Sequence, residues 1–556
     1  MSTLTRDLVA SATRSGRQLI TGTVEEPVRQ SWAQIHRQAL QMAGGLADRR
    51  VGPHTTVAVL ACDAADVAPL TQAIWLRRAA VTMLQQPTPR TDLAVWLADT
   101  VRAIAMIDAH LVVVGQPFLA AADHLRSQGL PVCTVGSLRG GTPLDFGPDL
   151  HARESDVALL QLTSGSTGMP KAVEITHANF AANAAAMCDA LDIDVDTDVT
   201  VTWLPLSHDM GMIAFLTVPM QLGVQCVAVT PELFLRRPLS WAQLISRHRA
   251  TITSGPNFAY SVLTRMLAGA DPAGLDLSSL RVAVNGAEPI DHRDMAEFAR
   301  VGARFGLRPS APTPGYGLAE ATLAVSFGAP HEPPVLDRVS RRAVGERHRA
   351  EPAEATETQT VVCVGKPVQG MEVRITRAGA PVPARDIGAI ELRGPAVARR
   401  YRTTTGAVPI TDAQGWLDSG DLGYLDERGR LYVCGRSKDL IVVAGRNLYP
   451  HDIERATEQV DGVRRGCVAA VRVGGDHEGF AVLAEVREPD HAETCGRIRR
   501  DVINRVVGHV GHAPRHVRLV RPGTLPKTAS GKLRRANARQ LLFDTDTDAD
   551  TEAMGA

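Results

Sequence analysis

The sequence has no excess of charge of either sign, because its 556 residues include 60 Lys and Arg against 60 Asp and Glu. A protein without net charge creates no general field that attracts nucleic acid or an anionic membrane. The chain also lacks an uninterrupted apolar run of the ~18 residues that a membrane-spanning helix needs. Its longest runs, such as AIAMIDAHLVVVG, are broken by Asp and His. We therefore expect no nucleic-acid partner and no integral membrane association.

Paired cysteine motifs are also missing, since the eight cysteines are scattered and no two form a C-x-x-C pair. Neither a zinc site nor a disulfide framework is indicated. Scattered thiols fit a reducing compartment. The N-terminal stretch MSTLTRDLVASATRSGRQL lacks the apolar core of a signal peptide. We expect a cytoplasmic protein.

Short apolar runs alternate with helical patterns along most of the chain, and apolar residues make up 44% of it. TTVAVLAC indicates a buried strand, VAPLTQAIWLRR a helix and AAVTML the next strand, and AIAMID, HLVVVG, VTVTWLPL and GVQCVAVT continue the rhythm. Strands that are apolar throughout are typical of parallel sheets covered on both faces. The sequence therefore predicts an α/β fold with parallel-rich sheets and flanking helices.

The composition changes at two places, which indicates the domain organisation. Residues 328–360 are rich in Pro, Arg and Glu, and we interpret them as an insertion-like loop that packs on the large domain or stays mobile. A charged, turn-like segment near Gly435 precedes a fresh strand and a helix that should begin at Pro450. We predict a large domain over residues 1–435 and a small, mobile α+β domain over 436–545. The acidic tail, 546–556, should be disordered.

A stretch rich in glycine and hydroxyl residues, LTSGSTGMPKAVEITH, follows the strand-like run VALLQL. Glycines let backbone N–H groups approach an anion, and hydroxyls and a lysine add donors and positive charge. The residues concerned are Thr163, Ser164, Gly165, Ser166, Thr167, Gly168 and Lys171. The pattern suits a polyphosphate, although it is not a Walker A loop. A plain surface turn has a similar composition.

This loop resembles the phosphate loop of the adenylate-forming superfamily, which includes acyl-CoA synthetases, luciferases and peptide-synthetase adenylation domains. The family signature reads roughly T-S-G-[ST]-T-G-x-P-K-G, and only Ala172 departs from it. Six further family motifs follow in the family's order: WLPLSHDMG, NGAEP, GYGLAEAT, WLDSGDLGYL, GRSKDLIVVAGRNLYPHDIE and LPKTASGKLRR. The resemblance covers nearly the whole chain.

Several sequence segments resemble the fatty acyl-AMP ligase branch in particular, among them PLSHDMG, GPNFAY and YGLAEATLAVSF. That branch typically carries an insertion after its YGxAE segment, where this chain has residues 328–360. In contrast, STGMPKAV resembles the acyl-CoA synthetase form of the phosphate loop. The resemblance thus implies ATP and Mg²⁺ as cofactors and leaves the thiol acceptor open between coenzyme A and carrier-protein phosphopantetheine.

The resemblance also implies roles for the nucleotide-binding residues. Glu320 would help hold Mg²⁺, and Asp421 would accept both ribose hydroxyls, while Arg436 would contact ribose or phosphate. Tyr316 would stack on the adenine, with Gly317 beside it in the ATP site, and the loop of Gly286, Ala287 and Glu288 would pass between the adenine and the acyl pocket. Without the surrounding motifs, Glu320 reads equally well as a helix-start acid and Asp421 as a turn residue.

Three further residues would carry the chemistry by the same resemblance. Lys532 would bridge the carboxylate and the α-phosphate, and Lys438 would be the hinge about which the small domain rotates between two half-reactions. His208 would lie near the carboxylate and the acceptor tunnel, although a lone histidine is more often structural. Ser207 stands where the family usually has an aromatic residue, so we expect room for a bulky acyl group.

The sequence therefore predicts an ATP-dependent ligase that converts a fatty or bulky apolar carboxylic acid to acyl-AMP and passes the acyl group to a phosphopantetheine thiol. An acyl carrier protein or a polyketide or peptide synthase would be its partner. One alternative is an enzyme that catalyses only thioester formation from acyl-AMP. A second is a non-catalytic nucleotide-binding regulator. A nicotinamide oxidoreductase is disfavoured, because GYGLAE lacks the last glycine of that fingerprint.

Overall fold

The chain divides into two compact units, and each is described by itself. The computed structural model describes residues 1–87, 91–145, 147, 151–164, 170–353, 358–443, 445–474, 479–527 and 533–542. The first unit comprises Met1–Arg338, Thr360–Ser419 and Gly423–Val433. The second comprises Val339–Gln359, Gly420–Leu422 and the chain from Cys434 onward. The acidic tail lies outside the described residues.

A nine-stranded sheet forms one half of the first unit. Its strand order is β17-β14-β13-β12-β11-β9-β10-β1-β2. The bounds are β1 Gln18–Gly22, β2 Pro27–Ser31, β9 Val199–Thr202, β10 Gln225–Ala228, β11 Ile252–Gly255, β12 Val282–Asn285, β13 Pro312–Gly317, β14 Ala324–Phe327 and β17 Lys366–Pro367. The neighbouring strands in the run β13-β12-β11-β9-β10-β1 pair in parallel. The pairs at the two edges of the sheet, β1–β2 and β13–β14–β17, are antiparallel.

An eight-stranded sheet forms the other half, in the order β22-β21-β8-β7-β4-β3-β5-β6. The bounds are β3 Thr56–Leu60, β4 Ala80–Met83, β5 Leu111–Val114, β6 Val132–Thr134, β7 Val157–Ser164, β8 Pro170–Thr176, β21 Arg400–Thr403 and β22 Gly406–Pro409. Strands from β7 to β6 pair in parallel, whereas β7, β8, β21 and β22 pair antiparallel. The predicted α/β fold with parallel-rich sheets is confirmed.

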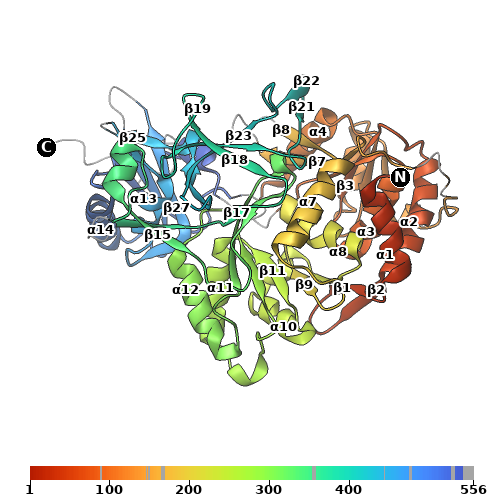
Figure 1. Ribbon diagram of the computed structural model, residues 1–556, viewed down its shortest axis with the longest axis horizontal. Helices are drawn as coiled ribbons and strands as arrows, with labels where there is room; N and C mark the ends of the chain where they lie inside the picture. Colours follow the sequence, from red (N-terminus) through yellow and green to blue (C-terminus); the bar gives the residue numbers. More distant parts are fainter. Residues whose placement is uncertain are drawn as a thin grey trace. The chain divides into compact units, whose positions relative to one another are not determined.

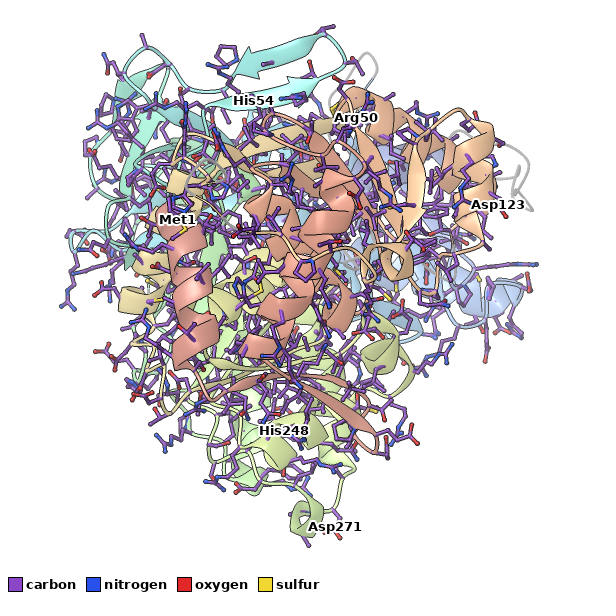
Figure 2. The ribbon with its side chains drawn as sticks, turned by 90° about the vertical axis from the view of Figure 1, so that its right-hand side faces the viewer. Met1, Arg50, His54, Asp123, His248 and Asp271 are labelled. Atoms are coloured by element: carbon purple, nitrogen blue, oxygen red, sulfur yellow. The ribbon has the colours of Figure 1, made fainter. Side chains whose placement is uncertain are left out.

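The helices of the first unit cover these sheets and bury their apolar faces on them. They are α1 Thr3–Arg14, α2 Trp32–Ala47, α3 Ala64–Leu76, α4 Leu93–Met106, α5 Ala121–Ser127, α6 Val135–Leu138, α7 His177–Ala190, α8 Val218–Leu222, α9 Pro231–Arg236, α10 Leu239–His248, α11 Asn257–Ala268 and α12 His292–Gly302. Helices α1, α2 and α3 pack side by side (Figure 1). Connections between elements reach the surface, as Figure 2 shows for Arg50 and His54 between α2 and β3.

The run AIAMID departs from the expected strand rhythm, because it closes helix α4. The side chain of Asp92 caps that helix by accepting hydrogen bonds from the backbone N–H groups of Ala94 and Val95. Trp96, Ala103 and Ile104 are buried at helical spacing. A short apolar run at the end of a helix cannot be told from a strand by its composition alone.

A smaller, five-stranded sheet has the order β19-β18-β20-β23-β24. Its strands are β18 Glu372–Arg377, β19 Ala380–Pro381, β20 Gly388–Arg393, β23 Leu417–Leu425 and β24 Leu431–Arg436. No helix in the described part of the chain is both long enough and apolar enough to cross a membrane.

The second unit is built on a three-stranded sheet of β27 Val463–Val473, β28 Gly479–Val486 and β29 His516–Val520. Its helices are α13 Pro450–Thr457, α14 Ala492–Val510 and α15 Arg535–Gln540, and α13 packs on both β27 and α14 (Figure 1). A hairpin of β25 Ile441–Val443 and β26 Arg446–Leu448 precedes them. The predicted helix start at Pro450 is confirmed.

Residues 328–338 of the insertion-like loop belong to the first unit, where Asp337 accepts a hydrogen bond from the Tyr424 hydroxyl over 2.8 Å, whereas Val339–Gln359 belongs to the second unit. Strand β15 (Leu336–Ser340) pairs with β16 (Thr358–Val362), and a π-helical turn spans Ala343–Arg347. Arg446 Nε donates to Glu346 Oε1 over 2.7 Å. The side chains of Asn447 and His348 are hydrogen-bonded at 3.0 Å, and Arg341 donates to the carbonyl of His509. A polar composition does not indicate which residues a segment contacts, so these partners could not be predicted from the sequence of the loop.

Candidate active site

The strands β7 and β8 form the antiparallel hairpin whose tip carries the glycine-rich loop. Thr163 lies opposite Lys171, and Ser164 lies opposite Pro170. The hydroxyl of Thr163 is buried and has no hydrogen-bond partner among the described residues. Gly165, Ser166, Thr167 and Gly168 lie outside those residues. The hairpin therefore fixes both ends of the loop and brings a lysine and an unbonded hydroxyl to its base.

Lys171 and Glu320 lie together, although 149 positions separate them in the sequence. Lys171 Nζ is 3.8 Å from Glu320 Oε1. Tyr401 joins them: its hydroxyl donates to Glu320 Oε1, and its ring centroid is 3.7 Å from Lys171 Nζ. An ammonium group and a carboxylate at this spacing can serve a phosphate and a cation side by side. Sequence reasoning missed Tyr401, because it lies in ARRYRTTT, outside the motifs that carry the resemblance.

The backbone around Glu320 is held in an unusual conformation. Glu320 belongs to a short 3₁₀ turn, Ala319–Ala321, and its carbonyl accepts from the N–H of Ala398 over 2.8 Å. The next residue beyond the turn, Thr322, has φ of 65°, which is rare for a β-branched residue. The Thr322 hydroxyl donates to the carbonyl of Ala396 over 2.6 Å. These bonds fix the turn and thereby the direction in which Glu320 projects.

The donor set of this cluster fits Mg²⁺ bound with a nucleotide. No group of three or more His, Cys, Asp and Glu residues forms a metal site within the described ranges. Mg²⁺ does not need one, because it keeps several waters and takes one or two carboxylates together with phosphate oxygens. The carboxylate of Glu320, whose side chain is 16% exposed beside Lys171, meets that requirement.

The expected adenine loop follows β12, at the carboxyl ends of the parallel strands. A Cβ atom added to Gly286 would lie 2.8 Å from the carbonyl oxygen of Gly315, so only glycine fits there. Ala287 has φ of 69°, which turns the chain sharply. Glu288 Oε1 accepts from the backbone N–H of Phe258 over 2.7 Å, at the N-terminus of α11. Glu288 thus has a structural role that its motif alone does not reveal.

Tyr316 and Gly317 lie at the end of the neighbouring strand β13. Tyr316 pairs with Ser326 of β14, and the register shifts between Tyr316 and Gly317. A Cβ atom at Gly317 would lie 2.0 Å from the carbonyl oxygen of Leu323. The strand order places β12 and β13 side by side, so this turn and the loop of Gly286 end at the same edge of the sheet.

His208 precedes the π-helical segment Met210–Thr217, which follows strand β9. Its Nδ1 lies 2.7 Å from Asp209 Oδ1, and the side chain is 20% exposed. The backbone carbonyl of the adjacent Ser207 accepts from Gln161 Nε2 over 3.0 Å. The Ser207 hydroxyl is buried and has no partner among the described residues. π-helical turns are rare and often mark functional sites.

The second unit holds Asp421, Arg436 and Lys438. Arg436 Nε lies 3.3 Å from Asp421 Oδ1, and the aspartate side chain is 8% exposed against 57% for the arginine. A nearly buried carboxylate with an exposed cation beside it can accept hydrogen bonds from a vicinal diol and contact an anion next to it. Lys438 is exposed in the 3₁₀ turn Ser437–Asp439.

Lys532 lies outside the described residues, but the chain on both sides of it is fixed. Lys527 and Leu533 form an antiparallel bridge, and the N–H of Arg534 donates to the carbonyl of Pro526 over 2.9 Å. Arg535 makes two bonds to Glu454, of 2.8 and 2.7 Å, and lies 3.2 Å from Asp439. Burial lowers the pKa of Arg535, but the negative charges of Glu454 and Asp439 outweigh it and raise that pKa. Arg535 therefore stays positively charged.

The matching protein family is described as AMP-binding enzyme, and its model covers residues 9–402. Rv1013 of Mycobacterium tuberculosis, which is described as a ligase, is 47% identical over 98% of this chain and 100% of its own length. A medium-chain fatty acid–[acyl-carrier-protein] ligase of Moorena producens is 36% identical over 72% of this chain and 70% of its own. A solved structure from a study of fatty acyl-adenylate ligases of E. coli and L. pneumophila superposes with a TM-score of 0.89 at 29% identity, covering 98% of this chain and 97% of that one.

Proposed function

The chain belongs to the family of AMP-binding enzymes, and on this premise we propose that it activates a fatty or bulky apolar carboxylic acid with ATP and passes the acyl group to a phosphopantetheine thiol. The observation that carries the proposal is the meeting of Lys171 and Glu320 beside the phosphate-loop hairpin. The relatives named as fatty acid ligases support the substrate class.

In the first half-reaction, a carboxylate oxygen forms a bond to the α-phosphorus of ATP while the bond from that phosphorus to the bridging oxygen breaks. Pyrophosphate leaves, and acyl-AMP remains. Both reactants are anionic, so the site must supply positive charge around an in-line transition state. Mg²⁺, when bound, neutralises phosphate charge. Glu320 would be its protein ligand, and Lys171 would contact the phosphates.

The nucleotide's other parts would be held by the residues to which the family resemblance gives these roles. Asp421 would accept the two ribose hydroxyls, and Arg436 would contact ribose or phosphate. Tyr316, Gly317, Gly286 and Ala287 would enclose the adenine, with Glu288 holding that loop to α11. Lys532 would bridge the carboxylate and the α-phosphate, and its long side chain can follow the charge as it moves.

In the second half-reaction, the thiol sulfur forms a bond to the acyl carbon while the bond from that carbon to the phosphate oxygen breaks. AMP leaves, and the thiol proton passes to solvent. We propose that the small domain rotates near Lys438 between the two steps, which removes Lys532 from the site. His208, next to the proposed acyl and acceptor region, would take part in this step. A carrier protein is the favoured acceptor, because the Moorena producens relative is named for transfer to an acyl carrier protein. These steps need ATP, Mg²⁺, a carboxylic acid and a thiol, which the expected cytoplasmic location would supply.

The test is pyrophosphate release from ATP and a panel of carboxylic acids, with no thiol present. The panel holds medium- and long-chain linear acids together with branched and aryl-substituted ones. We expect release that depends on the acid and on Mg²⁺. If no acid gives release but supplied acyl-AMP still yields a thioester, the enzyme catalyses only the second half-reaction. If neither occurs and ATP still binds, the protein is a nucleotide-binding regulator and the proposal is wrong.

A further inference from the structure

We propose that Tyr401 is a positioning residue that keeps Lys171 and Glu320 apart and correctly directed for ATP and Mg²⁺. The inference rests on the proposed function of those two residues. Tyr401 lies outside the motifs that carry the family resemblance, and it contacts both Lys171 and Glu320.

The backbone fixes Tyr401 relative to Lys171. Tyr401 pairs directly with Val173 across strands β21 and β8. Lys171 and Val173 are two residues apart in β8, so their side chains project from the same face of the sheet. Tyr401 and Lys171 are therefore diagonal neighbours on that face, within reach of a large aromatic side chain. The ring position thus follows from strand register and does not depend on a mobile loop.

The contacts of Tyr401 prevent Lys171 and Glu320 from closing into a tight pair. Their separation of 3.8 Å exceeds the ~2.8 Å of a direct charge-assisted hydrogen bond. The Tyr401 hydroxyl donates a hydrogen bond to Glu320 Oε1, and the face of the Tyr401 ring holds the Lys171 ammonium group 3.7 Å from the ring centroid. A cation over an aromatic face is stabilised without a hydrogen bond to the carboxylate.

This spacing matters because a closed pair would compete with both ligands. An ammonium bonded directly to Glu320 would have to be separated from it before a phosphate and a cation could bind. A hydroxyl on one carboxylate oxygen restricts rotation of the carboxylate and directs the other oxygen away from Tyr401. Removing the hydroxyl should therefore weaken Mg²⁺ binding, and removing the ring as well should also weaken ATP binding without metal.

The experiment is calorimetric titration of the full-length protein, first with ATP in the presence of a chelator and then with Mg²⁺ at saturating ATP. Tyr401→Phe should bind Mg²⁺ about tenfold more weakly, because it loses one hydrogen bond to a charged group. Tyr401→Leu should in addition bind ATP more weakly in the chelator. Tyr424→Phe is the matched control, since it removes a comparable 2.8 Å hydroxyl bond, to Asp337, and should change neither titration.

Two further variants separate this inference from the proposed function. Glu320→Gln should weaken Mg²⁺ binding, and adding Tyr401→Phe to it should cause no further loss, because the hydroxyl acts through the carboxylate. If Glu320→Gln leaves Mg²⁺ binding unchanged, the proposed metal role of Glu320 is wrong. If Glu320→Gln weakens it while Tyr401→Phe does not, or if the two losses add fully, only the role of Tyr401 is overturned. Thermal unfolding of each variant verifies that it is folded.

Discussion

At the residue scale, Gly286 occupies a position that admits no side chain. Gly286→Ala should shift the loop after β12, because its Cβ would lie 2.8 Å from the backbone oxygen of Gly315, which cannot move away as a flexible side chain could. We expect a loss of about 1–3 kcal/mol in unfolding free energy and weaker ATP binding. Gly140→Ala is the control, since a Cβ there meets nothing within 4 Å. Equal behaviour of the two variants in denaturant and in ATP titration would contradict the prediction.

A second prediction concerns Lys532. Lys532→Ala should lower the rate of acyl-AMP formation by about 10²-fold or more, because one preorganised charge at the transition state is lost. Transfer from supplied acyl-AMP should stay largely intact, since the lysine is expected to leave the site before that step. Lys527→Ala is the control on the same segment, where the ammonium group donates to the carbonyl of Gly466. Unchanged pyrophosphate release in Lys532→Ala would refute the assignment.

Single residues were predictable where chemistry required their type at a fixed motif spacing. The motifs gave Lys171 and Glu320, and the structure brings these two together. Tyr401 was not predictable, because it lies outside the motifs and acts through Glu320, which is distant in the sequence. Arg535 lies in the motif LPKTASGKLRR, but its pairing with Glu454 was not predictable, because that partner is also distant in the sequence. A tyrosine without a motif reads as an ordinary core or surface residue.

At the element scale, helix α7 begins with a buried histidine whose neutral form the fold requires. His177 Nδ1 is 3.0 Å from the hydroxyl of Ser2, and burial lowers the pKa of His177 from 6.5 to about 4. The unfolded chain therefore binds more protons than the folded one between these values, so stability is complete above pH 6.5 and falls as the pH falls towards 4. We expect a loss of about 2 kcal/mol between pH 7.5 and pH 5 from this residue.

The measurement is the urea midpoint at both pH values for the wild type and His177→Gln. The variant should be less sensitive to pH, whatever its stability at pH 7.5. His54→Gln, which changes an exposed histidine, should keep the pH dependence of the wild type. If His177→Gln and the wild type lose stability in parallel, burial of this histidine does not govern acid sensitivity.

Elements were predictable where an apolar run had the length and composition typical of one kind of element. The runs around β3, α3 and β4 met this condition, and each was placed correctly. AIAMID was misleading, because its capping residue, Asp92, lies more than ten positions upstream. The edge strands β21 and β22 gave no signal, since the side chains of β22 are exposed, those of β21 are mostly half-buried, and the pairing of β21 with β8 depends on distant sequence.

At the scale of the whole molecule, the insertion-like loop decides the predicted choice of acceptor. If the loop restrains rotation of the small domain, the intact enzyme should transfer poorly to coenzyme A and better to a carrier protein, whose docking surface can draw the domain round. Deleting about 25 residues within 328–360 should raise acyl-CoA formation and leave pyrophosphate release unchanged. Rapid acyl-CoA formation by the intact enzyme would place it with the coenzyme A ligases.

A milder variant tests the same idea through one contact. Arg446→Gln should raise acyl-CoA formation less than the deletion does, because it breaks only the bond from β26 to Glu346. Arg342→Gln is its matched control, since Arg342 also pairs with Glu346 but lies within the same π-helical region of the loop. A similar response to both substitutions would show that the contact with β26 is not what matters.

The division of the chain has a mechanical consequence for any such rotation. Along the sequence the chain passes between the two units five times, at 338/339, 359/360, 419/420, 422/423 and 433/434. A body joined by one flexible peptide segment can turn by changing a few backbone torsions at that segment. Val339–Gln359 is bonded to Arg446 and Asn447 of the second unit. While these bonds persist, changes in backbone torsions near Lys438 alone cannot rotate the second unit, because the backbone at both ends of Val339–Gln359 must turn as well. The loop thus adds two further points of torsional change, and hydrogen exchange at 336–340 and 358–362 should rise together with exchange near Lys438 whenever the second unit turns.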